Sequence, residues 1–189
     1  MTERKTVLVI GAGGIGSYLI PLIDRVELYD ITVADPDIIE TKNLLYQNYD
    51  VIDVGNNKAK TMGEKYNSVV ASSPYAILTE QQVLGYDLVV ACVDNLQLRK
   101  MLYRTGVDWL DLRAQGRNCM LLSSKVTGVE LEEMLIGDDT RTFSCQGDSW
   151  VGDKEGVQFM QAVVAGLGAQ WIQRYFGENE VEDFKMVSL

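Results

Sequence analysis

The most regular pattern in the chain is a series of short apolar runs, each followed by a polar or glycine-containing turn. Residues 6–10 (TVLVI) and 87–92 (DLVVAC) are almost continuously apolar, and residues 26–34 (VELYDITVA) form a longer, mixed run. Runs of β-branched and aliphatic residues are typical of strands buried on both faces of a parallel sheet. We therefore predict three strands here. Shorter runs predict three more, at residues 75–79, 108–112 and 118–126, the last with an alternation that also allows an antiparallel orientation.

Between these runs, apolar residues recur at helical spacing. Ile15, Leu19 and Ile23 share one face of a helix that begins at the glycine-rich turn after the first strand. Pro21 should kink or shorten this helix, because proline removes the hydrogen bond to the carbonyl four residues earlier. Further helices are expected at residues 57–68, 96–105 and about 156–176. Alternating strands and helices predict an α/β fold with a mainly parallel sheet and helices on both faces, which antiparallel strands can extend.

The rest of the chain carries weaker patterns. Residues 127–154 are rich in Gly, Asp and Ser, and we expect loops there with one short helical piece at residues 130–135. The last residues hold four acids and little periodicity. We expect one domain over residues 1–177 and an acidic tail over residues 178–189.

Charge and composition exclude several classes of protein. Seventeen basic against 27 acidic residues give a formal net charge of -10, which disfavours binding to nucleic acid or to an anionic membrane. No apolar run approaches the roughly 20 residues that span a bilayer, and the polar start MTERKT does not resemble a signal peptide. We therefore expect a cytoplasmic protein.

The chain contains no histidine, which excludes Ser-His and Cys-His nucleophile pairs and imidazole general bases. Its three cysteines, Cys92, Cys119 and Cys145, are widely spaced and form no CxxC pair, so neither a disulfide framework nor a zinc site is expected. Cys92 and Cys119 fall in predicted strands and should belong to the core. Catalysis must then depend on carboxylates, lysine, arginine, a thiol or a metal.

The turn after the first strand reads GAGGIG, with the GxGxxG spacing at Gly11, Gly13 and Gly16. Such glycines allow a tight turn and a close backbone approach to a phosphate, and the following helix N-terminus favours an anion. The motif alone does not identify a cofactor. Asp35 ends the second strand about 20 residues further on, the distance expected of a ribose-binding acid.

More polar residues follow Asp35 before the next helix. Asp37, Asn43, Gln47 and Lys58 lie at loop and helix-start positions. Acids, amides and a lysine gathered after one strand suit a ribose and a phosphate chain better than they suit a core.

Asp94 follows the strand at residues 87–92 and should lie at the same sheet edge as the glycine turn. A carboxylate there can hold Mg²⁺ against phosphate oxygens, and it can equally serve as the N-cap of the helix at residues 96–105. Arg99, on the first turn of that helix, either binds ligand or pairs with an acid.

Jointly these motifs resemble the ubiquitin-activating-enzyme (E1)-like adenylyltransferases of the ThiF, MoeB and HesA type. GAGGIG, DPDIIETKNLLYQ, DVGNNKAK and CVDNLQLR occur in the family's order and close to its spacing. The resemblance implies a Rossmann-like nucleotide-binding domain and a reaction in which the C-terminal carboxylate of a ubiquitin-like or sulfur-carrier protein attacks the α-phosphate of ATP. The products are an acyl adenylate and pyrophosphate. It also implies a homodimer or heteromer.

Carried over to this chain, the resemblance assigns ATP to the turn of Gly11, Gly13, Gly14 and Gly16. Asp35 would bind the ribose, Asn43 and Lys58 the phosphates, and Asp94 the Mg²⁺, with Arg99 supporting the site. Cys145 falls where several relatives carry a cysteine, which some use to hold an acyl or sulfur intermediate. Its loop setting is compatible either with a reactive thiol or with an ordinary structural cysteine.

The sequence also departs from the family pattern. An arginine is usual in the motif NLxRQ, but this chain has Tyr46, which can donate a hydrogen bond but brings no positive charge. The zinc-binding cysteine pairs of many relatives are absent. The alternative is therefore a nucleotide-binding, catalytically weakened subunit of a heteromer. An NAD-dependent oxidoreductase would explain Asp35 but not Asn43, Lys58 and Asp94.

Overall fold

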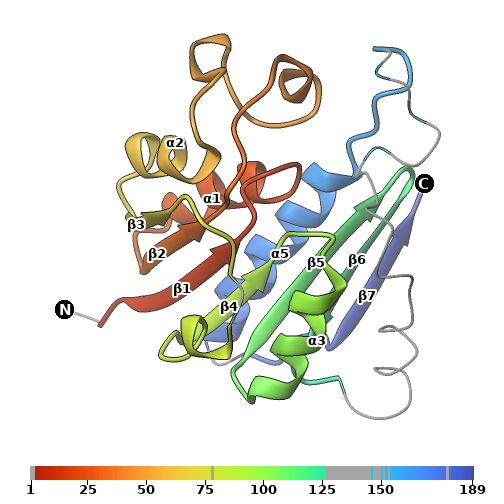
Figure 1. Ribbon diagram of the computed structural model, residues 1–189. Coiled ribbons are helices and arrows are strands. Elements are labelled where there is room, and N and C mark those ends of the chain that lie inside the picture. The colour runs from red at the N-terminus through yellow and green to blue at the C-terminus, as the bar shows by residue number, and fades with distance from the viewer. Residues whose placement is uncertain are drawn as a thin grey trace.

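The computed structural model describes residues 3–77, 79–126, 146, 150, 152, 154–177 and 179–189. Seven strands in these ranges form one sheet in the order β3-β2-β1-β4-β5-β6-β7 (Figure 1). The first five strands of this order are parallel to one another, and β6 is antiparallel to both β5 and β7. The strands are β1 (Lys5–Ile10), β2 (Tyr29–Ala34), β3 (Val69–Ser73), β4 (Leu88–Ala91), β5 (Trp109–Gln115), β6 (Asn118–Ser123) and β7 (Phe184–Ser188).

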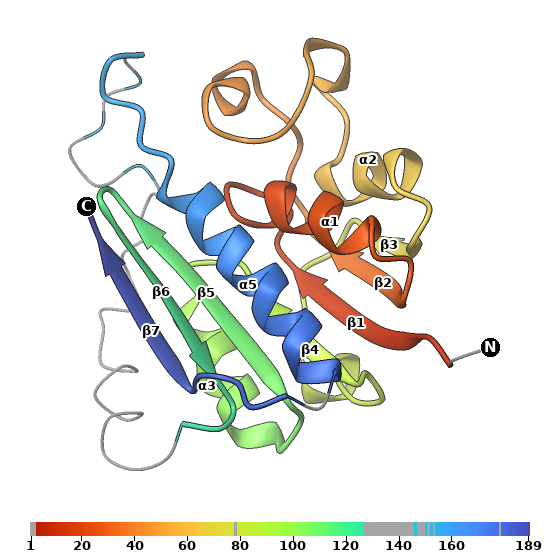
Figure 2. The ribbon, with the colours of Figure 1, turned by 180° about the vertical axis from the view of Figure 1, so that it is seen from behind.

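Helices cover both faces of the sheet. The α-helices are α1 (Gly16–Asp24), α2 (Lys58–Lys65), α3 (Leu96–Thr105) and α5 (Met160–Phe176), and the 3-10 turns are η1 (Thr41–Leu45), η2 (Val51–Asp53) and η3 (Glu80–Gln82). α3 lies on the face turned to the viewer in Figure 1, and α1 and α5 lie on the face seen in Figure 2. Alternate β1 residues enter the two cores: Val7 and Val9 pack with α1 and α5, and Leu8 and Ile10 pack with α3.

The fold class is confirmed as Rossmann-like α/β, with a mostly parallel sheet and antiparallel strands at one end. The third strand was misplaced: residues 75–77 and 79 are not in a strand, and β3 is Val69–Ser73. This strand is at the sheet edge and three of its five residues are exposed, so it lacks the apolar run of the central strands. The expected tail at residues 178–189 contains β7, which pairs with β6. The helical piece expected at residues 130–135 lies outside the described residues.

Pro21 lies inside α1, as the sequence indicates, and its missing N–H leaves the Ser17 carbonyl without its usual helical partner. The side chain of Asn48 takes that place, because its Nδ2 donates to Ser17 O at 3.2 Å. The Asn48 backbone N–H also donates to Ser17 Oγ at 3.0 Å. The loop after η1 is therefore fastened to the helix that begins at the glycine turn.

Among the described residues no helix combines the length and apolar character needed to cross a membrane.

Candidate functional site

The candidate site lies where β1 and β4 are neighbours, since the chain leaves β1 toward β2 on one side and β4 begins the other half of the sheet. Ligands of open α/β sheets bind at the carboxyl ends of strands at such a point. Gly11 follows β1 there with φ +94°, and a Cβ atom on it would lie 2.6 Å from Val93 Cγ1. A Cβ on Gly16 would lie 2.0 Å from Gly11 O. Glycine is required at both positions, because the turn folds back on itself and against the end of β4.

Asp35 is bound directly to the glycine turn. The backbone N–H of Ala12 donates to Asp35 Oδ2 at 2.6 Å, and the N–H of Asp37 donates to Oδ1 at 2.8 Å. The Tyr49 hydroxyl fixes the other side of Ala12 by donating to its carbonyl at 2.6 Å. Burial of the Asp35 carboxyl raises its pKa, and the charge of Lys58 opposes that effect. The acid at the end of β2 and the turn after β1 are therefore one hydrogen-bonded unit.

Lys58, the first residue of α2, is buried and brings a positive charge beside this unit. Its Nζ lies 2.9 Å from Oδ2 of Asp37, whose side chain is exposed. Asn57 holds the two segments together, because its Nδ2 donates to the carbonyls of Asp35 and Asp37 and its Oδ1 caps α2 at Lys60 N. The structure thus brings Asp35, Asp37 and Lys58 together, as the sequence predicts.

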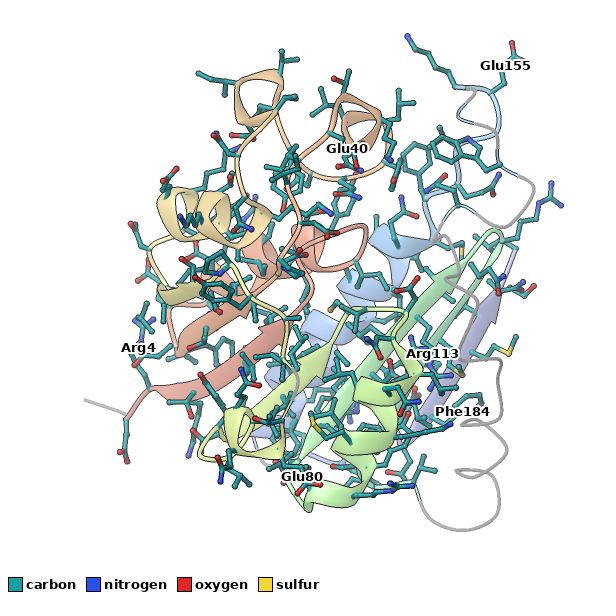
Figure 3. The ribbon with its side chains drawn as sticks, viewed as in Figure 1. Arg4, Glu40, Glu80, Arg113, Glu155 and Phe184 are labelled. Carbon is teal, nitrogen blue, oxygen red and sulfur yellow. The ribbon has the colours of Figure 1, made fainter. Side chains whose placement is uncertain are left out.

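Asn43 lies on η1 and Gln47 follows it shortly afterwards; Glu40, the N-cap of η1, is labelled in Figure 3. Asn43 Oδ1 accepts from Glu40 N, and its Nδ2 donates to the Tyr46 hydroxyl at 3.3 Å. Gln47 is buried, and its Nε2 would lie 3.9 Å from a Cβ placed on Gly13. Gln47 is therefore beside the glycine turn, whereas the Asn43 side chain is engaged in its own loop.

Two buried acceptors near η1 have no hydrogen-bond partner within the part of the chain that the structure describes. They are Oε1 of Gln47 and Oε1 of Gln161, a fully buried residue of α5. Gln161 reaches across with its Nε2 to Tyr46 O at 3.1 Å. Tyr46 also meets Trp150 edge to face, with ring centroids 5.3 Å apart. Because a buried unpaired oxygen is unfavourable, this part of the site is suited to a hydrogen-bond donor from water or a ligand.

Asp94 lies in the exposed loop that connects β4 to α3. It is not the helix cap: Asn95 is, since its Oδ1 accepts from Leu98 N at 3.0 Å. Arg99 pairs with an acid, the second of its two alternatives, through contacts of Nε with Asp111 at 3.1 and 3.2 Å. The loop therefore presents the Asp94 carboxylate outward at the sheet edge while neighbouring residues fix the backbone.

These residues fit Mg-ATP. Mg²⁺ is commonly held by one or two carboxylates together with substrate phosphates and water, so the exposed Asp94 would suffice as the protein's ligand to a bound ion. No cluster of three or more potential metal-ligating side chains occurs within the described residues. Cys145 lies outside these residues, and its role stays a prediction.

Four residues that shape the site were not predicted from the sequence: Tyr49, Asn57, Asp111 and Gln161. Asn57 is the first residue of the helix predicted at residues 57–68 but is the N-cap of α2, and asparagine at a helix start is a common N-cap signal. Asp111 is an acid within the apolar run WLDL, which also marks it as unusual. No local pattern distinguishes Tyr49 or Gln161, because their partners are distant in sequence.

The fold is a Rossmann-like α/β sheet whose glycine turn, acid and lysine meet at the switch point. The ThiF family model matches residues 2–185, and the chain belongs to this family.

Curated relatives match part of the chain. Adenylyltransferase and sulfurtransferase UBA4 of Yarrowia lipolytica is 30% identical over 113 residues, which are 56% of this chain and 28% of that protein. ATP-dependent ubiquitin transferase-like protein Cap2 of Enterobacter hormaechei is 27% identical over 117 residues, 57% of this chain and 19% of that protein. These alignments thus span less than a third of either relative.

Solved structures support the fold. MccB of E. coli in its crystal structure with ATP has a TM-score of 0.69 at 19% identity, covering 99% of this chain and 64% of that one. PaaA has a TM-score of 0.70 at 14% identity, covering 98% of this chain and 61% of that one. At such identities the likeness concerns the fold alone.

Proposed function

We propose that the chain is an ATP-dependent adenylyltransferase that activates the C-terminal carboxylate of a ubiquitin-like or sulfur-carrier protein. The observation that carries this proposal is the unit formed by Asp35, Ala12 of the glycine turn, Asp37 and Lys58 at the sheet switch point. A dinucleotide site needs the turn and the acid, but it does not need a lysine and a second acid beside them. The family membership and the adenylyltransferase relatives support the same reaction.

Each residue has a chemical role in this proposal. The backbone N–H groups of the glycine turn and the N-terminus of α1 bind phosphate oxygens. The Asp35 carboxylate accepts from the ribose hydroxyls, since its oxygens keep lone pairs beyond those used by Ala12 and Asp37. Lys58 neutralises phosphate charge, with Asp37 holding its ammonium group in place.

Asp94 would hold Mg²⁺, and the bound ion would supply positive charge that neutralises the leaving pyrophosphate. The carrier carboxylate attacks the α-phosphorus, forms a new P–O bond and displaces pyrophosphate. A carboxylate is already a nucleophile at neutral pH and needs no general base, so the reaction is compatible with a chain that lacks histidine. Orientation and charge neutralisation supply the catalysis.

A second candidate function is supported by Tyr46. Its hydroxyl accepts from Asn43, and it occupies the position of the family arginine without bringing a positive charge. In that case the chain is the nucleotide-holding subunit of a heteromer, and a partner supplies the missing cation. For either function we propose an oligomer, a homodimer in the first case and a heteromer in the second.

Pyrophosphate exchange into ATP tests the proposal. Purified protein is incubated with Mg-ATP, labelled pyrophosphate and a ubiquitin-like protein that ends in glycine, with the same protein lacking its last two residues as control. We expect exchange only with the intact carrier. Exchange by this chain alone with the carrier rules out the heteromer function. If no small protein encoded with this chain supports exchange and Mg-ATP does not bind, the adenylyltransferase function is wrong.

A further inference from the structure

A buried charged cluster connects β5 to the loop that carries Asp94. Asp111, on β5, is fully buried and accepts hydrogen bonds from three side chains. Tyr103 of α3 donates to Oδ2 at 3.0 Å, Arg113 Nε donates to Oδ2 at 2.8 Å, and Arg99 Nε donates to Oδ1 at 3.2 Å. Figure 3 shows Arg113 beside α3. One carboxylate thus faces two guanidinium groups from different elements.

Two of the side chains that bond to Asp111, Tyr103 and Arg113, also bond to each other. Arg113 Nη2 also donates to the Tyr103 hydroxyl at 3.0 Å, so the acid, the phenol and one arginine form a ring of contacts. Although burial alone lowers the pKa of Arg113, the facing Asp111 carboxylate raises it above its ordinary value. A buried carboxylate is tolerated only when it is paired in this way. Stability by itself would explain these three residues.

Arg99 extends the cluster beyond what stability requires. Its Nη2 donates to the carbonyl of Val93 at 2.6 Å, while Nε is held by Asp111. Val93 precedes Asp94 and is also the residue whose side chain would meet a Cβ on Gly11. The guanidinium group of Arg99 therefore joins the buried acid to the backbone of the loop between the glycine turn and α3.

We propose that Asp111 is a positioning residue for the nucleotide site. It orients Arg99, Arg99 fixes the Val93 carbonyl, and the fixed loop holds the Asp94 carboxylate where it meets Mg²⁺ bound to ATP. This inference rests on the proposed function. Neutralising Asp111 should loosen the loop and weaken the magnesium-dependent part of ATP binding, because residues that orient a metal ligand typically contribute about 10- to 100-fold to metal affinity.

The test compares Asp111→Asn with Asp108→Asn. Asp108 precedes β5 at the N-terminal end of the parallel strands, away from the glycine turn. It also accepts three hydrogen bonds, from Tyr175, Ser124 and Lys125. Both variants remove one hydrogen-bonded carboxylate charge, but only the first touches Arg99. If Asp111→Asn is unfolded at the assay temperature, Tyr103→Phe replaces it, since this change removes the two hydrogen bonds of the Tyr103 hydroxyl and leaves the carboxylate paired with Arg99 and Arg113.

Two readouts are measured on each folded protein. Amide hydrogen exchange at Leu98 and Arg99, whose N–H groups bond to Asn95, reports how firmly the loop and the start of α3 are held. The Kd for ATP with and without Mg²⁺ reports the site. We expect faster exchange at these amides and an about tenfold loss of Mg²⁺-dependent affinity in Asp111→Asn, with neither change in Asp108→Asn.

The possible failures are distinguishable. If wild-type protein binds no Mg-ATP, the proposed function fails and this inference fails with it. If wild-type protein binds Mg-ATP and Mg²⁺ lowers the Kd for ATP as much in Asp111→Asn as in wild type, the positioning role is wrong. This holds even where amide exchange is faster. The double variant Asp111→Asn with Arg99→Lys should weaken binding little more than either single change, and simple additivity would also overturn the proposal.

Discussion

The backbone N–H of Ala12 donates to Asp35 Oδ2 at 2.6 Å, which joins the turn after β1 to the end of β2. The contact has two consequences. It fixes the carboxylate at the position where a ribose would bind, and it keeps an ionisable group in a buried place, where charge is unfavourable. The stability of the folded protein therefore depends on the charge of Asp35, the residue that we propose to bind the ribose.

The first prediction concerns pH. Because burial raises the pKa of Asp35 above 3.8, the folded ligand-free protein holds this proton more tightly than the unfolded chain does. The associated stability is fully present below the unfolded pKa and is lost as pH rises through the folded pKa. Urea unfolding of wild type and Asp35→Asn from about pH 4 to pH 7 should show wild type losing stability relative to the variant. If the unfolding free energies of wild type and Asp35→Asn change with pH in the same way, the prediction is wrong.

A second prediction contrasts two glycines. Gly16→Ala places a methyl group 2.0 Å from Gly11 O, so the turn must shift. We expect a loss of about 2 kcal/mol or more of unfolding free energy and loss of ATP binding. Gly166→Ala, in α5, meets no atom within 4 Å and should stabilise the protein by about 0.5–1 kcal/mol. Thermal unfolding and an ATP titration check both, and unimpaired ATP binding by Gly16→Ala would show that the turn is not the phosphate site.

Tyr46 provides a gain-of-function prediction. Tyr46→Arg returns a guanidinium group to the family position and should lower the Kd for Mg-ATP about tenfold, which corresponds to about 1.4 kcal/mol. Tyr46→Phe is the control, since it keeps the ring beside Trp150 and removes only the hydroxyl that Asn43 contacts. Calorimetric titration measures both. Equal Kd values for the two variants would mean that position 46 does not face the phosphates.

Asn48 and Pro21 form a testable pair. Asn48→Ala removes the donor to Ser17 O and should lower the unfolding free energy by about 1 kcal/mol. In a Pro21→Ala background, residue 21 regains an N–H that can donate to the same carbonyl. Asn48→Ala should then lower the unfolding free energy clearly less than it does in wild type. A double-mutant cycle in urea measures the difference. Strictly additive effects would show that Asn48 does not compensate for the proline.

Much of the fold follows from local sequence. The helix at 96–105 was placed at its observed bounds because Asn95 caps its start and Gly106, with φ +71°, ends it. The central strands and the glycine turn were equally clear, since a strand buried on both faces must be apolar throughout. In contrast, β3 and β7 are edge strands with exposed residues, and their sequences show little of the pattern on which strand prediction depends.

Only those site residues that are close together in the sequence could be predicted to lie together. Asp35, Asp37 and Lys58 follow one strand, and the structure brings them together. The partners of Arg99 and Tyr46 were not predictable, because Asp111 and Gln161 reach them from β5 and α5. Which of several possible acids an arginine meets is decided by sheet order and helix packing. No local motif contains that information.

Nucleotide binding by wild type and Asp35→Ala tests the central claim most directly. Asp30→Ala is the matched control, since Asp30 is on β2, the strand that Asp35 directly follows, and is partly exposed and paired with Arg4. Each protein is heated alone, with Mg-ATP and with NAD. A ligand at 100 times its Kd adds about 2.7 kcal/mol to stability. We predict that Mg-ATP, and not NAD, stabilises wild type and Asp30→Ala, and that Asp35→Ala loses this stabilisation. Stabilisation by NAD alone, or equal stabilisation of all three proteins by Mg-ATP, would contradict it.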